Sequence, residues 1–563
     1  MSLETDIAKF TSLVQDWASK TSDVFYSDVA QDVTIKVIDT MGEVVDITIP
    51  NQKKMSNAFD VWKSAINLKN TNGVLTDDSG ADVSVSKFGG LTLAEYDAMY
   101  KTFINKESIK LVPNSGGSSQ MVGYDVMAVV TQDNRVLAWG WNSNNFLSYG
   151  MGANVGSVVE LQQDPTKKGV LISKIYVSGQ HIGILYEDGD LYLRGVQSLG
   201  HFGIGNTAAQ LKFVLSAQNV SDYITSANGD QDEQPMAAVI LTDGSVMTAG
   251  DNGHGELGIG NTTNTYTWTK VYDVASYSND KAIKCLINGS DTASFHILTE
   301  AGKLFISGYN GYGQLGNGTT GNVSTLTQIV PSVGGAKIID IVANGYYDDK
   351  YTGSTFILTD AGKVYATGYN GQGQLGTGDT TNLSSFTEVI YEANHDITTD
   401  PVVGIYTYHR TSAYLTQSGN LYAVGQASNG ALGDGTTTNN TAYQFILSNV
   451  KKFYPTVNAD ASQYPALYAI TNDNKLYSWG NGAYGQLGHY GSADILAPTQ
   501  VQFDKADLIT EVFHCGYSNQ GTVYFLTSEG FIYGCGRNNY GQVFPSGTIA
   551  DEYHASITKI NLG

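Results

Sequence analysis

The most suggestive chemical motif in the sequence is a glycine-rich loop. Gly311 to Gly316 (GYGQLG) matches G-x-G-x-x-G, the loop that cradles phosphates in dinucleotide-binding domains. That chemistry needs a helix directly after the loop, so that the helix N-terminus meets the phosphate. No helical pattern follows here, and the match recurs at Gly253 to Gly258 and at Gly371 to Gly376. The motif therefore predicts a structural loop in which glycine lets the backbone fold tightly.

Carboxylates and histidines are the other residues that offer metal or acid–base chemistry. The stretch Gly229 to Glu233 (GDQDE) lacks the longer ligand spacing of a calcium loop, so it favours a solvated acidic loop. The nine histidines are scattered without ligand partners at workable spacing. The sequence therefore predicts no catalytic residue, no metal ion and no cofactor, and a protein that is not an enzyme.

The net charge of the chain limits the kinds of partner that it can bind. The 563 residues include 31 Lys and Arg against 53 Asp and Glu, which gives a formal net charge of −22. Nucleic-acid binding needs clustered basic residues, so this balance argues against a nucleic-acid partner. No apolar run of about 18 residues occurs, which predicts no membrane span. The first residues, MSLETDIAKF, lack the basic and apolar regions of a secretory signal.

The three cysteines form no Cys-x-x-Cys pair, so we expect neither a zinc site nor a thioredoxin-like motif. Cys515 and Cys535 fall in one repeat. The favoured interpretation is that both cysteines are small, buried, unpaired residues. A disulfide between them is the alternative.

The glycine-rich loop belongs to a repeat of eight units that begins near Ile109. Each unit has an apolar strand, a tight turn, a second strand and an anchor glycine. The second residue of each turn is Gly or Asn, which tolerate a positive φ, and it precedes the anchor by six positions in every unit. The anchors, 55 to 60 residues apart, are Gly140, Gly195, Gly250, Gly308, Gly368, Gly425, Gly480 and Gly536.

A unit of this size holds about four short strands, and so small a sheet must bury its faces against neighbouring units. Seven or eight such units close most simply into a β-propeller, because closure removes exposed strand edges. We therefore predict an all-β fold, a β-propeller of seven or eight four-stranded blades, over residues 108–563. The C-terminal stretch Ala555 to Leu562 (ASITKINL) is a candidate strand for closing the ring.

Several phrases resemble the repeats of the regulator of chromosome condensation family. They are FHILTEAGKLFISGYNGYGQLGNG, TFILTDAGKVYATGYNGQGQLGTG and LYSWGNGAYGQLG. The resemblance extends over residues 109 to 563 and is weaker in the first two units. It implies a seven-bladed propeller, whereas this chain has eight units. It also raises guanine-nucleotide exchange with chromatin docking as a function, although this acidic chain lacks the basic surface which that role uses.

Residues that repeat between units are expected to serve structure. Asn310 and Asn370 should bond loop backbone, and Gln314 and Gln374 should do the same. The structural set comprises the anchors Gly250, Gly308, Gly368, Gly425, Gly480 and Gly536, with Leu315, Leu375 and Leu487 filling the core between blades.

Residues 1–107 lie outside the repeat and are predicted to form a small α+β docking module. Apolar residues at helical spacing predict helices at Leu3 to Lys20, Asn57 to Leu68 and Thr92 to Phe103. Alternation predicts a hairpin over Val33 to Pro50 that turns near Met41 and Gly42, and Asn70 to Gly80 is interpreted as a polar loop. The aromatic residues of the helices are expected to pack in a core, with a docking surface for another subunit as the alternative.

The segments that differ between units point to function, because loops on a rigid scaffold carry binding sites. Three insertions, Gly229 to Pro235, Gly345 to Gly353 and Asn458 to Tyr464, each precede the strand before the turn, so we expect them on one rim. Tyrosine there offers large contact area at low entropic cost. The candidate binding residues are Asp230, Asp232, Tyr346, Tyr347, Asp348, Asp349, Tyr351 and Tyr464. Ordinary exposed loops are the alternative interpretation.

Low charge and abundant Gly, Tyr, Thr and Asn favour a structural or receptor-binding protein of a large assembly. We predict a virion component of a phage tail, fibre or baseplate, oligomeric in the assembly. Residues 1–107 would dock to other virion or assembly proteins, and the propeller would bind a host surface protein or a glycan. The alternative is a secreted or cytosolic adaptor or inhibitor that binds proteins, and nucleotide exchange ranks last. The predicted location is the virion, with an extracellular or cytoplasmic location as the alternative.

Overall fold

The computed structural model divides the chain into two compact units, Met1–Lys106 with Gly563, and Glu107–Leu562. The described residues are 33–38, 44–49, 69–71, 74–76, 82–83, 109–110, 126–131, 133–141, 147, 154–178, 181–226, 235–289, 293–345, 353–455, 465–503, 508–515, 521–539, 543 and 553–560. In this part of the chain no helix has the length and apolarity of a membrane span.

The first unit contains a hairpin and a small three-stranded sheet. β1 (Val33–Ile38) pairs antiparallel with β2 (Val44–Ile49), which confirms the predicted hairpin. β3 (Lys69–Thr71), β4 (Val74–Thr76) and β5 (Asp82–Val83) form the sheet, in that order. The predicted polar loop from Asn70 to Gly80 is therefore wrong, because Lys69–Thr71 and Val74–Thr76 pair as antiparallel strands. The three predicted helices lie outside the described residues.

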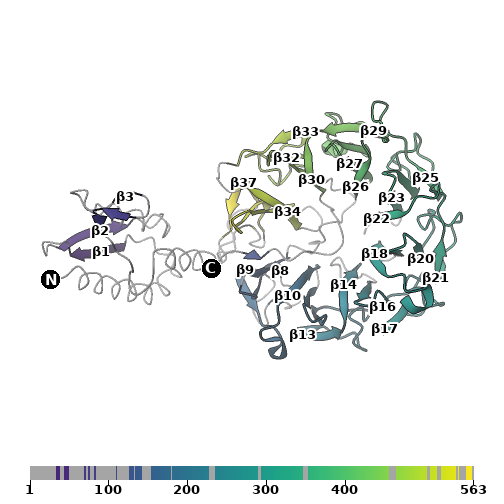
Figure 1. Ribbon diagram of the computed structural model, residues 1–563, viewed down its shortest axis with the longest axis horizontal. Coiled ribbons are helices and arrows are strands. Elements are labelled where there is room, and N and C mark those ends of the chain that lie inside the picture. Colours follow the sequence, from purple (N-terminus) through teal and green to yellow (C-terminus); the bar gives the residue numbers. More distant parts are fainter. Residues whose placement is uncertain are drawn as a thin grey trace. The chain divides into compact units, whose positions relative to one another are not determined.

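The second unit is a β-propeller of eight blades, each a four-stranded antiparallel sheet of consecutive strands (Figure 1). The all-β propeller is thus confirmed, with eight blades and not seven. Blades one to four contain β6 (Ile109–Lys110), β7 (Val126–Thr131), β8 (Val136–Trp141), β9 (Asn154–Leu161); β10 (Ile172–Val177), β11 (His181–Tyr186), β12 (Leu191–Gly195), β13 (Gln210–Ala217); β14 (Val220–Thr225), β15 (Met236–Leu241), β16 (Val246–Gly250), β17 (Thr265–Tyr272); β18 (Ala282–Asn288), β19 (Ser294–Thr299), β20 (Leu304–Gly308) and β21 (Val323–Ile329).

Blades five to eight continue the same pattern. They contain β22 (Ile338–Gly345), β23 (Gly353–Thr359), β24 (Val364–Gly368), β25 (Leu383–Glu388); β26 (Val402–Tyr408), β27 (Thr411–Thr416), β28 (Leu421–Gly425), β29 (Asn440–Leu447); β30 (Val450–Pro455), β31 (Ala466–Thr471), β32 (Leu476–Gly480), β33 (Ile495–Gln500); β34 (Ile509–Cys515), β35 (Thr522–Thr527), β36 (Ile532–Arg537) and β37 (Tyr553–Lys559). Three short 3₁₀ turns interrupt the connections, η2 (Pro165–Lys167), η3 (Val274–Tyr277) and η4 (Ser428–Gly430).

Burial follows the position of a strand within its blade. The second and third strands of a blade are covered by the blades on either side. In β19 and β20, for example, every residue is buried. Both faces of these strands meet other sheets, so their sequences are nearly continuous apolar runs. The outer strand β21 contains only half-buried and exposed residues, because one of its faces meets solvent.

The anchor glycines are required by close approach of the neighbouring strand. Gly368 has a φ of +104°, and a Cβ there would lie 2.1 Å from the carbonyl oxygen of Gly353. No other residue fits such a position without displacing the backbone. This strict requirement explains why one glycine recurs at the same place in each unit.

The ring closes by apolar packing between the first and eighth blades. Trp139 on β8 meets Tyr524 on β35 edge to face, with ring centres 6.2 Å apart, and Met127 and Leu526 join the same buried cluster. β37 pairs with β36 as the outer strand of the eighth blade. The predicted role of Ala555–Leu562 in closing the ring is therefore wrong, because eight complete units leave no blade to be filled.

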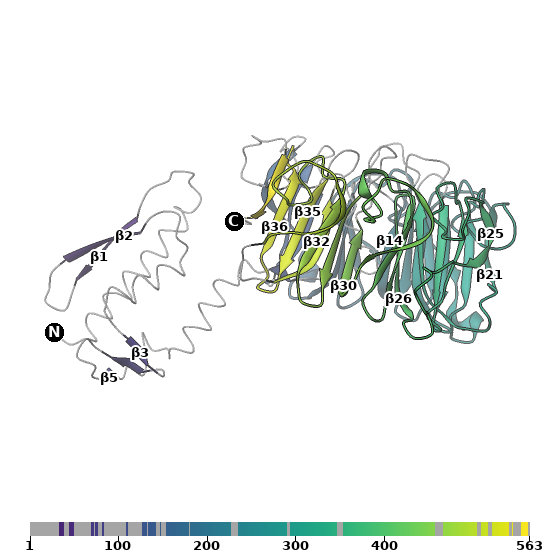
Figure 2. The ribbon, with the colours of Figure 1, turned by 90° about the horizontal axis from the view of Figure 1, so that it is seen from above.

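Successive loops alternate between the two faces of the ring, because neighbouring strands within a blade are antiparallel; Figure 2 shows the strands running from one face to the other. The links between first and second strands, and between third and fourth strands, lie on one face, which we name the loop face. The turns between second and third strands lie on the opposite face together with the connections between blades, and we name it the turn face.

Candidate functional site

The strands that flank the three predicted insertions end on the loop face. The insertions separate β14 from β15, β22 from β23 and β30 from β31, which are the first two strands of blades three, five and seven. The candidate binding residues themselves lie outside the described residues; they are Asp230, Asp232, Tyr346, Tyr347, Asp348, Asp349, Tyr351 and Tyr464. Their role as binding residues stays a prediction.

The glycine-rich loop of the fourth blade is held together by one asparagine. Asn310 donates from Nδ2 to the carbonyl of Thr319 at 2.9 Å, and its Oδ1 accepts the N–H of Leu315 at 2.9 Å. Leu315 is fully buried, and a Cβ on Gly316 would lie 2.4 Å from the ring of Phe386 in the next blade. The loop thus fastens one blade to the next, as the repetition predicted.

In blades two, three and five, the residue six positions after the anchor lies at the junction with the next blade. In blade five it is Gln374, whose backbone carbonyl accepts the hydroxyl of Ser412 in blade six at 2.7 Å. Blades two and three place His201 and Glu256 there, and both are buried. Neither residue was predicted from the sequence to lie at a blade junction, although an alignment of the units on their anchor glycines places both there.

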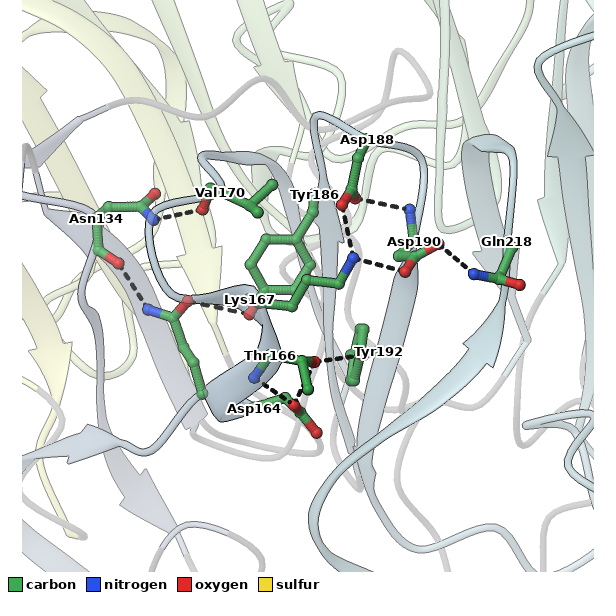
Figure 3. Close-up of polar contacts among 11 residues, drawn as sticks. Asn134, Asp164, Thr166, Lys167, Val170, Tyr186, Asp188, Asp190, Tyr192 and Gln218 are labelled. Carbon is green, nitrogen blue, oxygen red and sulfur yellow. Dashed lines mark hydrogen bonds and ion pairs between the residues drawn. The ribbon is translucent and has the colours of Figure 1, made fainter.

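On the turn face, the connection from blade one to blade two encloses a buried lysine (Figure 3). Lys167, at the end of η2, donates from Nζ to Asp188 at 2.6 Å and to Asp190 at 2.5 Å. Tyr186 and Tyr192 flank the ammonium, with ring centres 5.5 and 5.7 Å from Nζ. The two rings belong to the second and third strands of blade two, so the lysine fills a slot between them.

The charges of this lysine cluster stabilise one another. Burial by itself would lower the pKa of Lys167, but hydrogen bonds and charges of the two carboxylates outweigh it and raise that pKa. Burial would likewise raise the pKa of Asp188, but the bond from Lys167 and backbone N–H groups lower it by more. Gln218 donates to Asp190 at 3.0 Å, which ties the cluster to the next connection.

Other connections insert an aromatic ring where blade two holds its lysine. Between blades three and four, Tyr277 stacks on Tyr272 with ring centres 4.7 Å apart. Between blades five and six, His395 lies against Tyr414 and Tyr422, at centre distances of 5.4 and 5.1 Å. On the turn face, side chains from the connections therefore pack into the blades and hold the connections in place.

Charged clamps link the first strands of neighbouring blades, which surround the ring axis. The clamped pairs are Lys174 with Asp222, Lys284 with Asp340, and Lys452 with Glu511. Lys284 lies 2.7 Å from Asp340. Tyr454 strengthens the third clamp, because its hydroxyl donates to Glu511 at 2.7 Å. These contacts couple blades two with three, four with five, and seven with eight.

Three consecutive blades expose an aliphatic residue near the turn-face end of the first strand. Ile283, Ile339 and Val403 are 48%, 45% and 54% exposed, although the residue before each is buried. The register of each strand pair shifts at these residues, which marks a β-bulge. The bulged residue has no partner in the ladder, and its side chain is left at the surface. β18, β22 and β26 are neighbours around the axis, and we name these residues the apolar arc.

The buried histidines and the described cysteines serve packing. His181 lies 3.0 Å from the hydroxyl of Tyr223, and burial lowers the pKa of His181 to about 3 and that of His296 to about 4, so both are neutral near pH 7. Cys535 is a buried free thiol whose Sγ lies 3.1 Å from the carbonyl of Gln486, so it forms no disulfide. Within the described ranges, no three His, Cys, Asp or Glu side chains gather to hold a metal ion.

Comparison with protein families gives one match, in the seventh blade and the start of the eighth. Residues 473–521 match the family model described as "Regulator of chromosome condensation (RCC1) repeat". This segment is similar to an RCC1 repeat. The match includes the anchor Gly480 and the GQLG phrase from which the resemblance was inferred. The resemblance to this family is thereby supported, together with an RCC1-like propeller.

Curated relatives align with part of the chain. "Protein RCC2 homolog" from Danio rerio is 27% identical over 275 residues, which cover 44% of this chain and 53% of that protein. "E3 ubiquitin-protein ligase HERC2" from Homo sapiens is 26% identical over 261 residues, 46% of this chain and 5% of that protein. The chain thus spans about half of the zebrafish relative and a small part of the human one.

Solved structures with a similar fold include human WBSCR16, at 17% identity and a TM-score of 0.48, with 68% of this chain and 96% of that chain covered. Prp20p from Saccharomyces cerevisiae, described together with its binding properties to Gsp1p and histones, is 16% identical with a TM-score of 0.47, and the alignment covers 74% and 92% of the two chains. At such identities the similarity concerns the fold alone.

Proposed function

We propose that this protein is a protein-binding adaptor. It binds its partner on the turn face, and the apolar arc is the main contact site. The arc is the observation that carries the proposal. Adjacent exposed apolar side chains are typical of interaction surfaces, and covering a half-exposed Ile or Val stabilises a complex by roughly 1 kcal/mol. The RCC1 repeat and the RCC2-like relative support a binding role.

The scaffold under the arc favours binding because it is already ordered. The Lys284–Asp340 clamp joins the first two arc strands directly beside Ile283 and Ile339. A surface held in this way loses little conformational entropy when a partner arrives. The arc residues therefore contribute most of their contact energy to affinity.

The surroundings of the arc define the chemistry of the partner. In blade five, the turn between second and third strands lies next to the start of the first strand, since the N–H of Asp360 donates to the carbonyl of Lys337 at 2.8 Å. Both residues are exposed, so a charge of each sign borders Ile339. A partner with an apolar protrusion inside a rim of mixed charge fits this pattern, which protein interfaces commonly show.

A comparison of two surface variants tests the proposal. The arc variant carries Ile283→Ser, Ile339→Ser and Val403→Ser, and the control carries Val330→Ser and Ile390→Ser, which are exposed aliphatic residues outside the arc. A partner identified by crosslinking to the wild-type chain should bind the control with unchanged Kd and the arc variant at least tenfold more weakly. Equal binding by both variants would refute the proposal.

The adaptor replaces the virion component as our preferred interpretation. The relatives named above are zebrafish and human proteins, and they give no support to a phage tail, host attachment or glycan binding. The match to the RCC1 repeat agrees better with an adaptor or inhibitor, and nucleotide exchange is the second candidate. The ligase activity of HERC2 is not carried over, because the aligned part is 5% of that protein. A role without catalysis and a docking role for residues 1–107 remain our proposals.

A further inference from the structure

Two buried carboxylic side chains in blade three occupy the positions of two amide side chains in blade seven. In blade seven, Gln486 donates from Nε2 to Asn481 Oδ1 at 2.9 Å, and its Oε1 accepts the N–H of Tyr484 at 2.8 Å. Glu256 occupies the position of Gln486, six residues after its anchor, and Asp251 occupies the position of Asn481, one residue after it. Neither carboxylate of an ionised pair can donate the bond that links the two amides.

Glu256 reproduces only half of the amide arrangement. Its Oε2 accepts the N–H of His254 at 2.7 Å, as the glutamine accepts Tyr484. Its other oxygen, Oε1, is buried without a hydrogen-bond partner. Glu256 is 0% exposed and Asp251 is 3% exposed, so water does not compensate. The side chain of Asp251 interacts with that of Glu256, and two interacting carboxylates in such a site cannot both stay charged without a large free-energy cost.

The pair lies at the junction between blades three and four. Ser307 on β20 donates to the carbonyl of Glu256 at 2.9 Å, and a Cβ on Gly308 would lie 3.1 Å from the Glu256 side chain. Among the described residues, the titratable groups beside Glu256 are Asp251 and His254, while β20 presents the uncharged Ser307 and Gly308. Burial first, and then the nearby side chain and charge of Asp251, raise the pKa of Glu256 to about 8.

We propose that Glu256 carries a proton that it donates to Asp251, and that this bond forms a proton-operated latch at the junction of the third and fourth blades. With the proton present, one carboxyl donates to the other and restores the bond that the amides make in blade seven. Loss of the proton leaves two negative charges in contact, which pushes the Glu256 loop away from β20. The latch is therefore closed in acidic and neutral solution and loosens in alkaline solution.

The direction of the pH effect follows from linkage. The folded junction holds the proton at a higher pH than the open chain, where a glutamate titrates at about 4.5. The closed state thus binds more protons, and its stability is highest at low pH and falls as the pH rises from about 4.5 through 8. The opening constant is the ratio of open to closed junction at equilibrium. Between pH 6 and pH 9, the higher proton affinity of the closed state corresponds to roughly a hundredfold rise in this constant.

Hydrogen–deuterium exchange of the full chain tests the latch. The segment 251–258 is followed at pH 6 and pH 9 in the wild type and in Glu256→Gln, because comparison at equal pH cancels the intrinsic exchange rate. We expect opening of the wild-type segment, relative to the variant, to rise roughly a hundredfold over this range. Asp251→Asn should show a smaller rise. Glu300→Gln, an exposed glutamate of blade four, is the matched control and should behave as the wild type.

Two results would overturn the latch. Equal pH dependence in the wild type and in Glu256→Gln would show that the pair does not hold the proton. Suppression of the alkaline opening by millimolar calcium chloride, in the wild type but not in Glu256→Gln, would show that the pair is a cation site. Because neither readout uses a protein partner, the latch is tested independently of the proposed adaptor function.

Discussion

Replacing Lys167 by alanine should destabilise the propeller far more than replacing its neighbour Lys168. The side chain of Lys167 is 8% exposed and bonds to Asp190, which is 15% exposed, and to Asp188, which is 43% exposed. Lys168 is exposed. The pair of variants therefore compares a buried and an exposed lysine at adjacent positions of one connection.

The expected magnitude follows from the contacts that are lost. The bond to the buried Asp190 contributes about 2 kcal/mol, as hydrogen bonds between charged groups do. The bond to Asp188 contributes roughly 0.5 kcal/mol, because solvent screens a carboxylate exposed to this degree. Contact of the ammonium with Tyr186 and Tyr192 adds about 0.5 kcal/mol. Lys167→Ala should therefore lower the free energy of unfolding by about 3 kcal/mol, against less than about 0.5 kcal/mol for Lys168→Ala.

Urea denaturation of both variants over a range of pH provides the assay. The pKa of Asp188 is lowered from 3.8 in the folded state, so its stabilisation is fully present above pH 3.8 and is lost as the pH falls through the folded value. The pKa of Lys167 is raised from 10.5, so its stabilisation is present below pH 10.5 and is lost above it. The difference between the wild type and Lys167→Ala should hence be largest between these limits. Equal destabilisation by the two variants, or a difference between the wild type and Lys167→Ala that does not shrink as the pH falls below 3.8, would refute this reasoning.

Three further outcomes are expected. A double-mutant cycle with Lys284→Met and Asp340→Asn should give a coupling energy of about 1 kcal/mol, and a value near zero would show that the clamp does not join the blades. Gly368→Ala should cost more than about 3 kcal/mol or prevent folding, whereas Gly321→Ala, whose Cβ would meet no atom within 4 Å, should change stability by less than about 0.5 kcal/mol; similar losses at both sites would contradict the steric argument. Cys535 should react with a thiol reagent only as fast as the native protein unfolds, since burial raises the pKa of this thiol, and rapid labelling of the native state would show that it is accessible.

The repeat was predictable because its requirements are strict at single positions. Gly368 cannot carry a Cβ beside Gly353, and Asn310 alone satisfies several groups of its loop, so both types recur and reveal the unit. Ring closure was not predictable from the same signals. Trp139 and Tyr524 belong to apolar strands like those of every other blade, and nothing local tells which blade they will meet.

The apolar arc was hidden from the sequence for a physical reason. Ile283 follows the buried Ala282, and strand alternation alone cannot reveal a bulge that sends one extra side chain to the surface. Lys167 was hidden in a similar way, because in the run Lys167–Lys168 only the fold decides which ammonium is enclosed by tyrosines. The chemistry of such residues depends on contacts made by distant strands.

The clamps and the apolar arc together suggest where a partner would act on the ring. The arc crosses two junctions, and among the described residues only the first junction has a clamp, that of Lys284 with Asp340. At the position that follows Val403, blade six has Gly404, which offers no side chain to a neighbour. A partner that covers both Ile339 and Val403 would bridge blades five and six where the first strands lack an ion pair. Binding should therefore raise the protection of β26 from hydrogen exchange more than that of β18, because a ligand stabilises most the element that is least secured without it.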